Sequence, residues 1–271
     1  MMGKLTEKEV KKTKGLVVMK INLFACRLMI GILAGTVFMI GNAMAQTVSS
    51  PVKPDANKAV SAPAAKASLV FLGDSLTENH IHPQTAFDIL TKAGAATEKF
   101  RCYAWGGKTA GDLIGFIDAG KIDLSTDPKA ENIAVIMIGT NGYNMETLKQ
   151  LVEIVSKRGF KVVVLTTPPR RGPDTNSGAG GPGSNAGYNG SVRSAYPAMK
   201  PGLLQPVQVL DIVPALLDPD VRAGEWTNPK YNGDNVHLNK DGYVLIGEQV
   251  GKGLLASLSA KPDTAKSETQ K

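Results

Sequence analysis

One serine of this chain stands where a nucleophile would be exposed. Ser75 directly follows an apolar run, in the segment Leu-Gly-Asp-Ser-Leu-Thr at residues 72–77. Gly73 permits a tight turn, which would leave the Ser75 hydroxyl exposed at the end of a strand. A serine needs a neighbouring base to act as a nucleophile at neutral pH. Taken alone, a serine after Gly-Asp is more often a turn residue or a helix cap, so Ser75 is a candidate that needs a partner.

His237 is the candidate base among the three histidines of the chain. Asp234 stands three residues before it, within one turn of chain, so its carboxylate can fix the tautomer of the imidazole and stabilise the imidazolium. His80 and His82 are nearer to Ser75 in sequence but lack a comparably placed carboxylate, with Glu78 and Asp88 left as alternative partners for them. A purely structural turn before the last helix is the alternative interpretation of Asp234 and His237.

Acyl transfer also needs hydrogen-bond donors for the negative charge that develops on the carbonyl oxygen. Gly107 offers an unobstructed backbone N–H, and Asn141 offers a side-chain amide just after an apolar run. An asparagine after Gly-Thr is about as often an ordinary turn residue. These two positions are therefore candidate oxyanion donors.

The elements that must position these residues follow from the hydrophobic pattern. Apolar runs predict strands at 68–73, 99–104, 133–138, 162–166 and 207–212. Apolar residues at helical spacing predict helices at 83–93, 110–119, 145–158 and about 240–258. Strands that alternate with helices predict an α/β fold, with a mostly parallel sheet between two helical layers. Ser75, Gly107 and Asn141 follow the carboxyl ends of three of these strands, which is where such sheets bind ligands.

The first 45 residues predict a secretory signal. A short basic stretch from Met19 precedes an apolar run at 28–41, which is short for a membrane span, and then the small-residue site Ala43-Met44-Ala45. We expect cleavage after Ala45, with Met19 as a second candidate start. The expected localisation is secreted or periplasmic, and an uncleaved N-terminal anchor is the alternative.

The remaining chain divides by composition. Residues 46–67 are rich in Ala, Pro and Lys and predict a flexible linker, and residues 259–271 predict a polar tail. The domain between them, 68–258, contains a segment at 170–190 that is dense in Gly, Pro, Asn and Ser. A loop of this length is usually a lid, a binding loop or disordered.

Charge and cysteine content exclude several classes of function. The net charge is +7, but residues 1–45 hold seven of the 31 basic and two of the 24 acidic residues, which leaves 24 against 22. A nearly neutral domain without a basic, aromatic stripe does not predict a nucleic-acid partner. Cys102 is the one cysteine after Ala45, so the mature chain cannot form an internal disulfide, and we expect a buried, inert thiol.

Taken together, four motifs resemble those of the SGNH/GDSL hydrolases, a family of serine esterases and lipases. They are Gly73-Asp74-Ser75-Leu76, Gly106-Gly107-Lys108-Thr109, Gly139-Thr140-Asn141 and Asp234-Asn235-Val236-His237-Leu238, in the order of the family, within residues 69–258. Each motif alone is weak, and four in order are strong. This sequence departs from the family at Gly142, where Asp is common, and at Glu78-Asn79-His80.

The resemblance implies a fold and a set of roles. The fold would be a three-layer α/β/α, flavodoxin-like arrangement around a five-stranded parallel sheet, with no metal and no cofactor. Ser75 would be the nucleophile, His237 its base and Asp234 the partner of the base. The oxyanion hole would consist of the Ser75 N–H, Gly107 and Asn141.

The expected function is therefore a secreted or periplasmic serine ester hydrolase that forms an acyl-enzyme on Ser75. It would cleave small acyl esters of the acetyl type, with a small molecule or a carbohydrate as the alcohol. It would have no nucleic-acid partner and no stable membrane span after processing. Alternatives are a lipase or lysophospholipase, an acyltransferase of the same family and, from another class, a non-catalytic binding domain that kept the fold. The sequence leaves the oligomeric state open.

Overall fold

Five parallel strands form the centre of the structure, a computed structural model that describes residues 66–170, 185–200, 205–220, 225 and 227–259. The sheet order is β2-β1-β3-β4-β5, and every neighbouring pair is parallel. The strands are β1 (Ala67–Gly73), β2 (Arg101–Ala104), β3 (Glu131–Met137), β4 (Lys161–Leu165) and β5 (Val207–Leu210). The predicted signal segment and residues 171–184 of the predicted loop lie outside the described residues.

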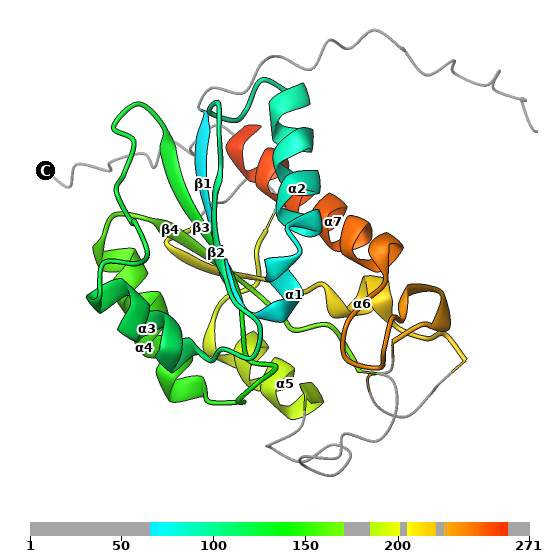
Figure 1. The fold of residues 1–271 in the computed structure, drawn as a ribbon. Helices are drawn as coiled ribbons and strands as arrows, with labels where there is room; N and C mark the ends of the chain where they lie inside the picture. Colours follow the sequence, from blue (N-terminus) through cyan, green and yellow to red (C-terminus); the bar gives the residue numbers. More distant parts are fainter. Residues whose placement is uncertain (1–65, 171–184, 201–204, 221–224, 226, 260–271) are drawn as a thin grey trace, which may run out of the picture. The chain divides into compact units, whose positions relative to one another are not determined.

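Helices cover both faces of this sheet (Figure 1). One face carries α2 (Ile81–Lys92), the short α6 (Val213–Leu216) and α7 (Lys240–Ser259). The other face carries α3 (Ala110–Asp118), α4 (Met145–Lys157) and α5 (Asn185–Ala195). Alternate side chains of β1 serve the two cores: Leu69 and Phe71 pack with the α2 side, and Val70 and Leu72 with the α3 side. The predicted three-layer α/β/α fold is confirmed.

Two short elements connect this framework to the loops. The one-turn helix α1 (Ser75–Glu78) follows β1, and the 3₁₀ turn η1 (Pro229–Tyr231) precedes the segment that leads into α7. Among the described residues, no helix has the length and apolar character needed to cross a membrane.

The predicted loop at 170–190 is wrong for its last residues, because α5 begins at Asn185. Glycine, serine and asparagine are weak helix formers, so the composition gave no helical signal there. Tertiary contacts override that propensity: Tyr188 and Val192 are buried in the core, and Asn185 and Asn189 are buried and hydrogen-bonded. Two smaller corrections concern the ends of the domain, since Ala67 belongs to β1 and Ser259 to α7.

The helices α2 and α7 approach each other closely because α7 carries glycines on the shared face. A Cβ atom at Gly251 would lie 2.9 Å from the Cβ of Ile89 and 3.1 Å from the carbonyl oxygen of Ala86. Gly253, two residues on, has no such restriction, since its nearest neighbour would be 3.5 Å away on Leu210.

This difference yields a paired prediction for stability. Gly253→Ala should raise the free energy of unfolding by about 0.5–1 kcal/mol, because alanine is the better helix former. Gly251→Ala should lower it by about 1–3 kcal/mol, because the added methyl group meets the Cβ of Ile89 and the carbonyl oxygen of Ala86, which are both fixed by the backbone of α2. Urea denaturation of both variants measures the two changes. An equal stabilisation by both substitutions would contradict the close packing.

Candidate active site

Ser75 lies at the end of β1 as the first residue of α1. The preceding residue, Asp74, caps the helix: its Oδ1 accepts a hydrogen bond of 3.0 Å from the backbone N–H of Leu76. The cap fixes the first turn of α1 and with it the position of the half-buried Ser75 side chain. The Oγ atom of Ser75 lies 2.8 Å from Nε2 of His237.

His237 and Asp234 belong to a tight loop before α7. Asn232 pairs with Leu238 across this loop, and the backbone N–H of Gly233 donates to the carbonyl of His237 at 2.9 Å. The Oδ2 atom of Asp234 lies 2.9 Å from Nδ1 of His237, and its Oδ1 accepts the backbone N–H of the same histidine at 2.7 Å. Asp234, His237 and Ser75 therefore form one continuous hydrogen-bonded array.

The loop also sets the charge of Asp234. Hydrogen bonds from the backbone N–H and then the side chain of His237 lower the pKa of Asp234 to about 2. The N–H of Val236 adds a further bond at 3.1 Å to Oδ1. The carboxylate consequently stays negatively charged at neutral pH, beside the histidine that contacts Ser75.

The two other histidines occupy different surroundings. His82 is fully buried, and its Nε2 lies 3.2 Å from Oγ1 of Thr77. Burial lowers the pKa of His82 to about 3, so it is neutral at ordinary pH. His80 is exposed and has left-handed backbone, with φ of 61°. The structure thus brings His237, and neither of these, to Ser75.

The candidate oxyanion donors lie in the loops that follow β2 and β3, the two strands beside β1. Gly73 at the end of β1 is level with Ala104 of β2 and with Met137 of β3, so all three chains leave the sheet together. A Cβ atom at Gly106 would lie 3.8 Å from the Cβ of Ser75. Gly107 follows with φ of +72°, a left-handed conformation that favours glycine.

Asn141 meets this loop from the other side. Its Nδ2 donates to the carbonyl of Lys108 at 3.1 Å, which holds the amide beside the residue that follows Gly107. Both Gly107 and Asn141 are exposed. The structure therefore brings the predicted site residues to one edge of the sheet: Ser75, Asp234 and His237 through hydrogen bonds, and Gly107 and Asn141 beside them.

Sequence reasoning missed the role of Asp74 as a buried charge. Its side chain is completely buried, and its Oδ2 makes no hydrogen bond with the described part of the chain. Burial raises the pKa of Asp74 to about 6, against the lowering effect of the N–H groups of Leu76, Gly139 and Thr140 and of His237. Its place directly before Ser75 was the signal that could have marked it.

Two further side chains contact the Asn141 turn and carried no signal in the sequence. Nη2 of Arg170 donates to the carbonyl of Thr140 at 2.8 Å, and the hydroxyl of Tyr188 donates to the carbonyl of Ile138 at 2.8 Å. Both residues lie in the segment predicted as a loop. As for metals, the described residues contain no group of three or more His, Cys, Asp or Glu side chains placed to hold an ion.

The raised pKa of Asp74 predicts a specific pH dependence of stability. The folded state favours the neutral carboxyl, so this group costs nothing below pH 4 and destabilises the fold increasingly as the pH rises through 6, by roughly 3 kcal/mol in total. Asp74→Asn removes the titration. The free energy of unfolding of this variant, relative to wild type, should rise between pH 4 and 7 in urea denaturation.

Asp118→Asn is the matched control, because Asp118 is exposed at the end of α3. A constant difference between Asp74→Asn and wild type over this range would show that Asp74 does not titrate there. A pH-independent offset from replacing the side chain does not affect this comparison.

Comparisons with known proteins bear on the fold. No protein-family model and no curated protein matches this chain. Solved structures resemble it at low identity, among them the following two. One is a protein from Bacteroides fragilis provisionally named an acylhydrolase, with 21% identity over 76% of this chain and 91% of that chain and a TM-score of 0.51. The other is a member of the lipolytic G-D-S-L family from Veillonella parvula, with 18% identity over 69% and 97% and a TM-score of 0.50. The structural neighbours of this chain thus include lipolytic GDSL/SGNH proteins, and it has their three-layer α/β/α fold.

Proposed function

We propose that this chain is a serine ester hydrolase of the SGNH/GDSL type. The observation that supports this most is the array from Asp234 through His237 to Ser75, with donor-bearing loops on both neighbouring strands. A nucleophile, a base and an orienting carboxylate at hydrogen-bond distances are what acyl transfer requires.

The geometry suggests the following sequence of steps. Nε2 of His237 accepts the proton of the Ser75 hydroxyl while Oγ attacks the ester carbonyl. The charged Asp234 holds Nδ1–H and stabilises the imidazolium. His237 then donates the proton to the departing alcohol, which leaves an acyl group on Ser75. A water molecule, activated by the same histidine, releases the acid.

The negative charge on the tetrahedral intermediate needs donors that are free to reach it. The N–H groups of Ser75 and Gly107 are two of them. The side-chain amide of Asn141 carries two N–H donors, and one bonds the carbonyl of Lys108. The second remains for the substrate oxygen, while the first fixes the plane of the amide.

The substrate we propose is an ester of a short acyl group such as acetate, with a carbohydrate as one candidate alcohol. A long acyl chain needs an apolar trough beside the nucleophile. Residues 77–84 are polar or charged except for Ile81 and Pro83, and Ile81 packs against the core. The Glu78 carboxylate instead borders Gly106, where a Cβ atom would lie 2.9 Å from its Oε2.

On the evidence of residues 1–45 we propose that the enzyme is secreted or periplasmic.

The central test is loss of activity on p-nitrophenyl acetate. Ser75→Ala and His237→Ala should each lower kcat by at least about 10³-fold, and the double variant should be little worse than either, because the two residues act as a unit. Ser191→Ala, which removes an exposed hydroxyl on α5, is the matched control and should leave kcat unchanged. Near-normal turnover by Ser75→Ala would end the assignment.

A serine-directed phosphonate separates an enzyme from a binding domain that kept the fold. Mass spectrometry should find one added phosphonyl group on wild type and none on Ser75→Ala. An unlabelled, inactive wild-type protein would favour the non-catalytic alternative.

The acyl preference follows from the polar surroundings of Ser75. Burying each CH₂ is worth about 0.8 kcal/mol, so a true trough would favour octanoate over acetate by roughly 10³-fold in kcat/KM. We expect no such gain in a series of p-nitrophenyl esters from acetate to decanoate. A steady rise through octanoate would reject the short-acyl proposal and support a lipase.

A further inference from the structure

The turn that carries Asn141 has little to hold it from within. It leaves β3 at residue 138, and the N–H of Gly142 closes it by donating to the carbonyl of Gly139 at 3.0 Å. Asn141 and Gly142 are exposed at its tip. An exposed amide can serve as a precise donor only when the backbone beneath it is fixed by other parts of the chain.

Tyr188 of α5 fixes the start of this turn. Its side chain is 2% exposed, and its hydroxyl donates to the carbonyl of Ile138 at 2.8 Å. The ring also fills the space above Gly139, where a Cβ atom would lie 2.4 Å from Cε1 of the tyrosine. Gly139 has φ of +137°, a backbone conformation that residues with a side chain rarely adopt. Tyr188 thus occupies the place that a side chain at 139 would take.

Arg170 fixes a second peptide group of the same turn. Its Nη2 bonds the carbonyl of Thr140, which belongs to the peptide group that leads into Asn141. The guanidinium lies 5.8 Å from the centre of the Tyr143 ring, and that ring lies 5.6 Å from the ring of Tyr188. The two contacts on the turn are therefore linked through Tyr143.

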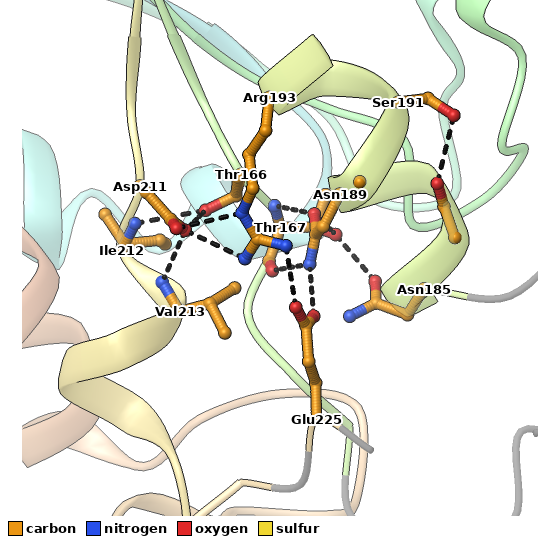
Figure 2. A network of polar contacts seen from close by, with 12 residues as sticks. Thr166, Thr167, Asn185, Asn189, Ser191, Arg193, Asp211, Ile212, Val213 and Glu225 are labelled. Carbon is orange, nitrogen blue, oxygen red and sulfur yellow. Dashed lines mark hydrogen bonds and ion pairs between the residues drawn. The ribbon is translucent and has the colours of Figure 1, made fainter. Parts of the chain in front are cut away.

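The helix that supplies Tyr188 is itself anchored to the sheet by polar contacts (Figure 2). Asn189 accepts the backbone N–H of Thr167 at 2.8 Å and donates to its carbonyl at 2.9 Å, just after β4. Arg193 bonds Asp211 after β5 at 2.9 Å and Glu225 at 2.8 Å. A helix of weak helix formers is in this way fixed to the ends of two strands.

We propose that Tyr188, together with Arg170, is a positioning residue that holds the Asn141 amide where charge develops on the substrate oxygen. The proposal rests on the proposed function for the role of Asn141, but its structural part can be tested without any substrate. Loss of the tyrosine hydroxyl frees the carbonyl of Ile138 and loosens the turn, and small misplacements of an oxyanion donor reduce kcat strongly.

The substrate-free test is amide hydrogen exchange of the full chain, measured by NMR. Tyr188→Phe keeps the ring and removes one hydrogen bond, so amides of residues 139–142 should exchange about three- to tenfold faster. Tyr196→Phe is the matched control, because the Tyr196 hydroxyl is buried without a hydrogen-bond partner among the described residues. Unchanged exchange at 139–142, or equal acceleration in α7, would overturn the proposal.

The kinetic test asks whether Tyr188 acts through Asn141. Tyr188→Phe should lower kcat on p-nitrophenyl acetate about 5- to 30-fold with little change in KM, and Tyr196→Phe should stay within twofold of wild type. In the Asn141→Ala background, Tyr188→Phe should change kcat less than twofold. An equal loss in both backgrounds would show that Tyr188 acts elsewhere.

The two readouts separate failure of this proposal from failure of the proposed function. A wild-type chain without esterase activity removes the proposed function, and hydrogen exchange then still decides whether Tyr188 holds the turn. If Tyr188→Phe does not fold, Arg170→Lys replaces it in both measurements, because lysine keeps the charge but loses the guanidinium geometry at the carbonyl of Thr140. Unaltered exchange and kcat in that variant would equally overturn the proposal.

Discussion

Parallel pairing of β1 with both of its neighbours is the constraint on which the rest of the site depends. Gly73 stands opposite Ala104 on one side and Met137 on the other. Because parallel strands all end at the same edge, the segments that follow them begin side by side, however far apart they are in sequence. Ser75, Gly107 and Asn141 are neighbours for this reason, and the turns after each strand only adjust their final orientation.

His237 reaches the same edge by a different route, through helix packing. Its loop is fixed at the start of α7, where a Cβ atom at Gly242 would lie 2.9 Å from the Cβ of Leu238 and 3.0 Å from the carbonyl of Tyr231. The helix in turn packs closely on α2. The 2.8 Å contact between His237 and Ser75 therefore depends on glycines of α7 that are not themselves part of the hydrogen-bonded array.

Features that depend on short-range residue patterns could be predicted from the sequence. Apolar runs located the five strands, and the motif spacing selected His237 over His82. The sequence did not predict α5, because glycine, serine and asparagine give no helical signal and the helix depends on contacts made by Tyr188 and Asn189. The roles of Arg170 and Tyr188 were equally hidden, since their partners Thr140 and Ile138 are backbone carbonyls far away in sequence. Every residue has a backbone carbonyl, so the residue type does not show which carbonyl accepts such a bond.

The two carboxylates beside Ser75, Asp234 and Asp74, lie in opposite electrostatic environments. Asp234 is exposed and held by N–H groups, so it stays charged beside the histidine, with a pKa of about 2. Asp74 is buried, and its pKa of about 6 marks an unfavourable environment for its charge. Proteins carry unfavourably placed groups of this kind mainly at functional sites. Asp74 lies between the N–H groups of α1 and of the Asn141 turn, so its cost to stability is tied to the alignment of the candidate nucleophile with a candidate oxyanion donor.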